Sequence, residues 1–329
     1  MPTVAAVVVS GVSALVAGCM AASAGSAGSG ALEKTNIVVE DYPTVDSAGL
    51  YIAEQEGLFK QQGLNVKIQF APASELTVNS AVNGTADIAI SDYVTYIDDE
   101  VENDDKLRIV AEASTLQPND MVLLTPPGSQ IKTLAQLEGQ TIAVQNVGNI
   151  STLLIRALLT EDGIRTRDVD IEQGFTLLNV AQQLAAGQTE SPGEPPAAAA
   201  PIPEPFASEG EQQYGLQELA DIDEGGTKNF PLEGYAVTQS WAKKYPNTLA
   251  AFLRALDEGQ EIADRDRAAV ETALEKFLGI SAATAAVIAL PDYPLAISDS
   301  QLQRVVDTMV QFSLLPSSDL SFKMSGMTG

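Results

Sequence analysis

The 329-residue chain contains no histidine, one cysteine and few basic residues. The absence of histidine excludes a Ser–His dyad, histidine metal ligands and the most common general base. With a single cysteine there is no internal disulfide, so the stability of the fold depends on its hydrophobic core. The sequence therefore favours a binding protein over an enzyme, and we expect neither a cofactor nor a metal site.

Basic residues are outnumbered by acidic ones, with 18 Lys and Arg against 44 Asp and Glu and a formal net charge of −26. Such a surface repels the phosphates of nucleic acids and anionic lipid head groups, so we expect neither as a direct partner. The same charge keeps a protein soluble outside the membrane. The length suffices for two ordinary domains.

The one cysteine follows a short apolar run, Val4–Ala17, and Leu15–Cys19 resembles a bacterial lipobox. The run has the length of a signal-peptide core and is short for a membrane span. We expect residues 1–19 to be a lipoprotein signal peptide and Cys19 to carry the lipid that anchors the protein to the outer face of the cell membrane. The alternative is a buried structural cysteine.

The segment after Cys19 is poor in residues that build a core. Ala21–Gly30 consists of Ala, Ser and Gly, and residues 20–34 are expected to form a flexible tether. No Lys or Arg precedes the apolar run, although a signal peptide normally begins with basic residues. This predicts a start of translation upstream of Met1.

The most informative segment is Asn36–Phe70, which has the pattern of a strand–helix–strand unit. Ile37–Val39 is a short apolar run, and Asp46 is placed to cap a helix that ends at Gly57. In open α/β sheets, ligands bind beyond the carboxyl ends of the strands and near helix N-termini. The pattern therefore places a small solute near Asp41–Ser47.

Gly49–Lys60, followed by Gly63–Val66, resembles the opening of ABC-transporter solute-binding proteins of the nitrate/sulfonate/taurine and thiamine-pyrimidine-precursor type. The resemblance runs from about residue 35 to 315. It implies an α/β fold of the periplasmic-binding-protein type II, with two α/β lobes of mixed sheets, two crossovers between them and C-terminal helices.

The expected boundaries follow from this plan. Residues 35–118 form the first segment of lobe 1 and residues 119–240 form lobe 2, because Met121–Leu124 starts a new sheet. The chain is expected to cross back near the strand Tyr235–Val237. Residues 241–329 supply C-terminal helices that pack on both lobes, mainly on lobe 1.

One segment departs from the plan. Gly84 precedes the short buried strand Ala86–Ile90, and Gly187 is its counterpart in lobe 2. After Gly187 the proline-rich segment Thr189–Pro203 occupies the place of a central strand, where proline is not tolerated. The segment is interpreted as an insertion loop or a local reading-frame error, with the family pattern resuming at Glu204.

The resemblance implies that the solute lies between the lobes, against loops that follow strands. These loops carry Tyr42, Asp46, Ser47, Ser74, Ser91, Asp92, Tyr93, Asn149, Ser151, Thr152, Glu204 and Phe206. Asp46, Asn149 and Ser151 are equally suited to be plain helix caps. Tyr42 and Tyr93 either pack on an aromatic solute or lie on the surface.

These loops contain no Lys or Arg. A buried carboxylate beside an anion costs several kcal/mol unless it is protonated or paired. If Asp46, Asp92 or Glu204 faces the solute, a neutral or cationic heteroaromatic compound is favoured over nitrate or a sulfonate.

The leading hypothesis is a monomeric, lipid-anchored receptor of an ABC importer. It captures a small nitrogen or sulfur compound by lobe closure and delivers it to the permease and its ATPase. A second hypothesis is a surface sensor or adhesin that keeps the fold without transport. A third is a secreted, histidine-free enzyme.

Overall fold

The computed structural model describes Met1, residues 30–103, 106–188 and 196–315, and Met327. The chain divides into two units of contacts, residues 1–31 and residues 32–329. Cys19 and its lipobox lie outside the described residues, as do residues 189–195. Across the described part of the chain, every helix is too short or too polar to cross a membrane.

The first lobe is built on a five-stranded mixed sheet in the order β2-β1-β3-β10-β4. Strand β1 is parallel to β2 and β3, whereas β10 is antiparallel to both of its neighbours, β3 and β4. The strands are β1 (Asn36–Asp41), β2 (Asn65–Phe70), β3 (Ile88–Asp92), β4 (Leu107–Thr115) and β10 (Pro231–Thr238).

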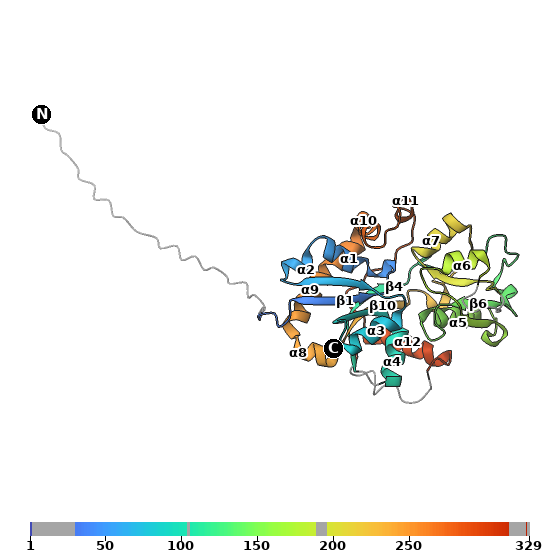
Figure 1. Ribbon diagram of the computed structural model, residues 1–329, viewed down its shortest axis with the longest axis horizontal. Coiled ribbons are helices and arrows are strands. Elements are labelled where there is room, and N and C mark those ends of the chain that lie inside the picture. The colour runs from blue at the N-terminus through green and yellow to red at the C-terminus, as the bar shows by residue number, and fades with distance from the viewer. Residues whose placement is uncertain (2–29, 104–105, 189–195, 316–326, 328–329) are drawn as a thin grey trace. The chain divides into compact units, whose positions relative to one another are not determined.

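Helices cover both faces of this sheet. Figure 1 shows α1, α2, α9 and α10 on one side and α3, α4 and α12 on the other. After β10 the chain is helical, as the sequence predicts. The helices are α1 (Ala48–Gln55), α2 (Leu58–Gln61), α3 (Ser74–Asn83), α4 (Tyr93–Asn103), α8 (Gln239–Lys244), α9 (Pro246–Arg265), α10 (Arg267–Phe277), α11 (Ala282–Ala285) and α12 (Asp299–Gln311).

The second lobe has a three-stranded sheet, β8-β5-β9, and a two-stranded parallel sheet, β6-β7. A parallel bridge between Ile142 and Ala199 connects them. Its strands are β5 (Met121–Thr125), β6 (Thr141–Val144), β7 (Asp170–Gln173), β8 (Ala200–Pro203) and β9 (Gln217–Asp221), and its helices are α5 (Ile150–Glu161), α6 (Val180–Ala186) and α7 (Phe206–Glu209). Short 3₁₀ or π turns, η1 to η5, occupy Val45–Ser47, Leu134–Leu137, Thr166–Asp168, Gly210–Tyr214 and Gly225–Thr227.

Joined by that bridge, the strands of the second lobe run β7-β6-β8-β5-β9, which repeats the plan β2-β1-β3-β10-β4 of the first lobe. The expectation of two mixed α/β lobes is confirmed. The chain passes between them after β4 and again before β10. Because β10 is buried between β3 and β4, the second lobe ends before Pro231 and not at residue 240 as the sequence suggested.

The interpretation of Thr189–Pro203 as a loop or a frame error is wrong for residues 200–203, which form β8. Strand N–H groups alternate in direction, so Pro201 and Pro203 leave donors missing only on the edge that faces away from β5. On that edge the contact with β6 ends at Ala199, so no donor is needed further along. Proline is therefore tolerated in this central position.

The predicted cap at Asp46 is also wrong. Thr44 caps η1, its hydroxyl accepting from the Asp46 N–H, and Ser47 is the residue before α1. The predicted helix ends at Gly84 and Gly187 are confirmed, since both glycines adopt the left-handed conformation at a C-cap.

Helices α1 and α9 cross at small residues. A Cβ atom at Gly259 would lie 2.3 Å from the backbone oxygen of Gly49 and 2.9 Å from the Cβ of Ala53. Next to this crossing, the buried Gln260 donates from its Nε2 to the carbonyls of Glu112, Ala113 and Pro294, at 3.0–3.1 Å. The close approach of the two helices thus lets one side chain tie α9 to the end of β4.

This crossing predicts that Gly259→Ala destabilises the protein, because the backbone of α1 must move away from the added methyl group, at a cost of about 1–3 kcal/mol. The gain in helix propensity, about 1 kcal/mol, offsets only part of a cost expected near the upper end of this range, since the contact is with backbone. Urea unfolding measures the effect. Glu258→Ala, at the exposed preceding position, is the control and is expected to change stability little. Equal or higher stability of Gly259→Ala would show that the helices are not in contact here.

Candidate functional site

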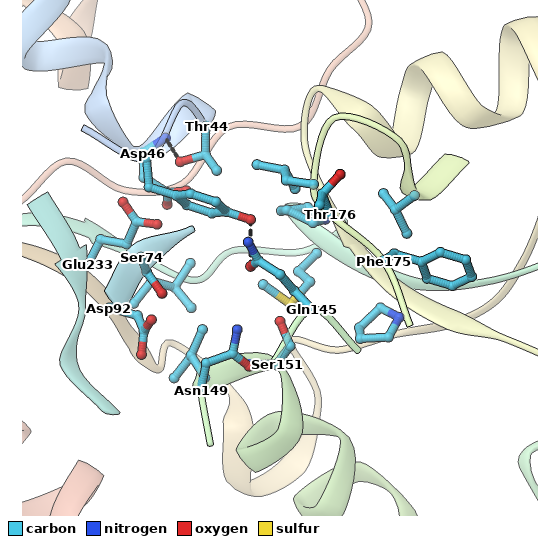
Figure 2. A pocket seen from close by; sticks show the side chains of 18 of the residues that line it. Thr44, Asp46, Ser74, Asp92, Gln145, Asn149, Ser151, Phe175, Thr176 and Glu233 are labelled. Atoms are coloured by element: carbon cyan, nitrogen blue, oxygen red, sulfur yellow. Dashed lines mark hydrogen bonds between the residues drawn. The ribbon is translucent and has the colours of Figure 1, made fainter. Parts of the chain in front are cut away.

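A cavity lies where the two sheets present the carboxyl ends of their strands to one another (Figure 2). Its walls come from the loops after β1 and β6, from the starts of α3 and α5, and from the strands β3, β8 and β10. The lining residues are Tyr42, Thr44, Asp46, Ser74, Asp92, Met121, Ala143, Gln145, Asn149, Ile150, Ser151, Phe175, Thr176, Leu177, Val180, Pro201, Pro203, Leu232 and Glu233. We call this cavity the cleft.

The first lobe gives the cleft an acidic wall. Asp46 on η1, Asp92 at the end of β3 and Glu233 on β10 are all buried, and none of the described residues lining the cleft is basic. Burial raises the pKa of all three carboxyl groups above their usual range. For Glu233 the neighbouring carboxyls of Asp46, Asp41, Asp92 and Asp120 raise the pKa further.

The three carboxyl groups differ in their partners. Asp92 accepts from the backbone N–H of Thr95 at 2.9 Å and from its hydroxyl at 2.7 Å, and thus holds the start of α4. By contrast, Oδ1 of Asp46 and Oε2 of Glu233 have no hydrogen-bond partner within the described residues. These two carboxyl oxygens and Oγ1 of Thr176 on the opposite wall are the buried lining atoms without a partner among the described residues, and they are left for a ligand.

The second lobe gives the cleft an apolar wall. Phe175, Leu177 and Val180 precede or begin α6, and Pro201 and Pro203 come from β8. Figure 2 shows Phe175 and Thr176 on the side opposite Asp46 and Glu233. The cleft thus combines buried carboxyl groups on one side with hydrophobic surface on the other.

Hydrogen bonds join the lobes across the cleft. The Tyr42 hydroxyl donates to Oε1 of Gln145 at 2.7 Å, and Nε2 of Gln145 donates to the carbonyl of Pro72 at 3.1 Å. Beside them, Nδ2 of Asn146 donates to Oε1 of Glu75 at 3.1 Å. The loop after β6 therefore makes direct polar contacts with the loops after β1 and β2.

Half of the residues predicted from the sequence line the cleft, namely Tyr42, Asp46, Ser74, Asp92, Asn149 and Ser151. Asn149 is also the predicted helix cap, since its side chain accepts from the N–H groups of Ser151 and Thr152 at the start of α5.

The others lie elsewhere. The Ser47 hydroxyl donates to Asp41, the Ser91 hydroxyl to the carbonyl of Ser74, and the Thr152 hydroxyl to the carbonyl of Asn146. These three side chains complete local hydrogen bonds behind the cleft wall. Tyr93 packs in the hydrophobic core.

Glu204 and Phe206 sit outside the cleft. The Glu204 carboxylate accepts from the N–H and hydroxyl of Ser208 and from the N–H of Ala289, so it supports the start of α7 and a C-terminal loop. Phe206 lines a separate apolar groove with Phe70 and Leu178.

Sequence reasoning missed Gln145, Glu233 and the apolar wall. Gln145 follows β6 as Tyr42 closely follows β1, so the repeat of the two lobes could have indicated it. Glu233 offers no such signal, because it lies inside a strand that returns from the other lobe. Pro201 and Pro203 lie in the segment that the sequence pattern indicates to be an insertion loop or a reading-frame error, whereas the structure places them in β8.

The cleft offers a ligand both hydrogen-bond acceptors and apolar surface. No set of three or more Asp, Glu, His or Cys side chains suited to a metal ion occurs among the residues that the structure describes. A positively charged or N–H-rich solute would find acceptors at Asp46 and Glu233 and an apolar surface facing them.

Known proteins resemble this chain in sequence and in fold. The family model described as NMT1/THI5 like matches residues 44–267, more than half of the chain. The chain belongs to the NMT1/THI5-like family. A Bacillus subtilis relative with the name "Putative binding protein YtlA" is 24% identical over 260 residues, which cover 73% of this chain and 74% of that protein.

Solved structures share the fold. The alkanesulfonate-binding protein SsuA from Xanthomonas axonopodis, bound to MOPS, has a TM-score of 0.72 at 20% identity. The match covers 88% of this chain and 97% of the SsuA chain. The nitrate-binding protein NrtA from Synechocystis has a TM-score of 0.75 at 14% identity, and the match covers 91% of this chain and 87% of the NrtA chain. The fold of this family member is therefore the periplasmic-binding-protein fold, as the sequence predicts.

The buried acids predict an unusual pH dependence of stability. Burial raises the pKa of both Asp41 and Glu112 to about 7. Between the unfolded-state pKa near 4 and that value, each group holds a proton only in the folded state, so stability falls as pH rises, by about 1.4 kcal/mol per pH unit and group.

Urea unfolding at pH 5, 6, 7 and 8 measures this slope. Glu112→Gln removes one titrating group and is expected to flatten it, whereas Glu56→Gln, at an exposed position, leaves it unchanged. A wild-type stability that rises over this range, or an unaltered slope in Glu112→Gln, would contradict the assignment.

Proposed function

We propose that this chain is the solute-binding receptor of an ABC importer and that its solute is a small nitrogen compound, cationic or rich in N–H donors, with an apolar body. The observation that carries the proposal is the acidic wall formed by Asp46, Asp92 and Glu233, unaccompanied by a basic residue among the described lining residues. The sequence and fold of the family support the receptor role.

Within this proposal the two lobes enclose the solute, and contacts made to both shift the equilibrium between open and closed forms. The loops after β1 and β6 already meet through Tyr42 and Gln145. No bond in the solute is made or broken. The partners are the transmembrane permease and its ATPase, and the receptor acts as a monomer.

The proposal includes an extracytoplasmic location and a lipid anchor at Cys19. The sequence Leu15–Cys19 and the tether that follows it support this part. Two or more acyl chains make such an anchor stable, since each buried methylene contributes about 0.8 kcal/mol.

A cationic solute is favoured over the sulfonates and nitrate of the structural neighbours for an electrostatic reason. An anion in this cleft would lie beside buried carboxyl groups, at a cost of several kcal/mol unless protons or cations enter with it. An amidinium or aminopyrimidine can instead donate to a carboxylate while its ring packs on Phe175 or Leu177.

The alternative of a surface sensor or adhesin was motivated by Thr189–Pro203. Since β8 completes the second sheet and lines the cleft, that motive no longer applies. A third possibility, a histidine-free enzyme, has no specific arrangement in its favour.

Calorimetry with probes of matched shape and opposite charge tests the solute class. Benzamidine, a planar cation, is expected to bind, and benzenesulfonate, with the same ring and a negative charge, is not. Formylaminopyrimidine represents the neutral heteroaromatic class, and taurine the sulfonates. Tight binding of benzenesulfonate or taurine with no binding of the other two would overturn the proposed solute class.

Variants locate the interaction. Asp46→Asn is expected to weaken benzamidine binding about 10- to 100-fold, the range for one hydrogen bond to a charged group. Glu56→Gln serves as the control, because Glu56 is exposed at the end of α1. An unchanged affinity in Asp46→Asn would place the cation elsewhere.

A further inference from the structure

The cleft contains two carboxyl groups whose surroundings differ from those of the third. Asp46 and Glu233 come from separate elements, η1 and β10, and Figure 2 shows them on the same side of the cleft. Each is more than nine-tenths buried, and each has an oxygen with no partner among the described residues. Asp92 lines the same cleft, but Thr95 engages both of its oxygens.

We propose that Asp46 and Glu233 together form the counter-ion for the positive charge of the solute, and that a proton leaves this pair when the solute binds. This inference rests on the proposed function, because it takes the solute to be a cation. It adds Glu233 as a specificity-determining residue and makes binding dependent on pH.

The groups that face the pair are acidic or uncharged. Acidic neighbours come from β1 (Asp41), β3 (Asp92) and the segment before β5 (Asp120). Phenol groups come from the loop after β1, α1, α4, β10 and the segment before α12, namely Tyr42, Tyr51, Tyr93, Tyr96, Tyr235 and Tyr293. Arg267 is the basic group that acts on Tyr293, and it is bound to Glu271 and to the carbonyls of Ala285 and Ile288.

Two carboxylates in such surroundings are not both ionised while the cleft is empty, because both are buried and the Asp46 carboxyl raises the pKa of Glu233 further. A proton on the pair removes one charge. Once a positively charged ligand is bound, it can compensate the negative charge of the pair at Oδ1 of Asp46 and Oε2 of Glu233, which have no partner among the described residues.

The exchange balances in charge and atoms. A cationic solute enters, the carboxyl group that held the proton passes it to water or buffer, and the resulting carboxylate accepts the N–H bonds of the solute. A neutral solute leaves the proton in place, and an anion requires uptake of a further proton. The sign of the proton exchange therefore reports the charge of the solute that the cleft selects.

Calorimetry of benzamidine binding in phosphate and in Tris, which differ in ionisation enthalpy, measures the proton count. Benzamidine stays positively charged throughout the range from pH 5.5 to 8. We expect release of between about 0.5 and 1 proton at pH 7, and affinity that rises up to tenfold per pH unit while the pair is protonated. Benzamidine binding with no proton release, or with uptake, would overturn the inference and leave the proposed function standing.

The pH dependence of binding in Glu233→Gln distinguishes a counter-ion role of Glu233 from a merely structural one. Glutamine imitates the protonated acid, so this variant is expected to match the wild-type affinity at pH 5.5, to lose the increase toward pH 8 and to release fewer protons. Glu56→Gln, at an exposed position outside the cleft, is the control and is expected to keep the proton release. A wild-type pH profile in Glu233→Gln would contradict the assignment.

The empty protein tests the pair without a ligand. Carboxyl ¹³C NMR of the wild type, with Glu233→Gln and Asp46→Asn for assignment, is expected to show one of the two groups protonated at pH 6. Ionisation of both at that pH overturns the inference whatever benzamidine does. A protonated pair with no binding of benzamidine or formylaminopyrimidine would overturn the proposed function, and with it the counter-ion role.

Discussion

Carboxyl groups buried at the strand ends of the first lobe, without a basic partner, are the constraint on which the rest of the site depends. Asp41 ends β1, Asp92 ends β3 and Glu233 lies in β10, so three neighbouring strands bring acids to one edge of the sheet. Burying charge without a partner costs far more than a hydrogen bond returns. Each such group must therefore be protonated, accept hydrogen bonds from nearby donors or bind a ligand. Asp41 and Asp92 have local donors, whereas Asp46 and Glu233 each keep an oxygen free for the cleft.

The architecture explains why these acids meet an apolar surface. Both lobes use the same strand order, so the loop after β6 faces the cleft as the loop after β1 does. In the first lobe the strand next to the edge pair is β3, which ends in Asp92. In the second lobe that place is taken by β8, which contributes Pro201 and Pro203 instead. The two lobes thus have the same backbone arrangement, and the difference in their sequences makes one wall of the cleft acidic and the other apolar.

Local sequence patterns predicted most helices and strands. The features that they missed depend on pairing between strands that are distant in the sequence. The cap at Asn149 and the glycines after α3 and α6 follow from rules about neighbouring residues, and the structure confirms them. The strand β8 was missed because the tolerance for proline depends on which edge of the strand is paired, and that information comes from β5 and β6. Glu233 was missed for a similar reason. The sequence predicts a return near Tyr235–Val237, but nothing near Glu233 shows that β10 inserts between β3 and β4, and this placement brings its side chain to Asp46.

The hydrogen bond between Tyr42 and Gln145 relates the fold to the proposed mechanism. Both residues line the cleft and come from opposite lobes, so their bond is one of the contacts that hold the two lobes together beside a bound solute. The contacts of the solute must still offset the cost of ordering it. An apolar body alone gains only burial, which the second lobe offers to any hydrophobic molecule. A donor that reaches Asp46 and Glu233 gains acceptors that no described residue of the protein uses, and this gain is open only to solutes of the right charge. In the proposed function, selectivity therefore resides in the first lobe, and the second lobe mainly encloses the solute that the first lobe has selected.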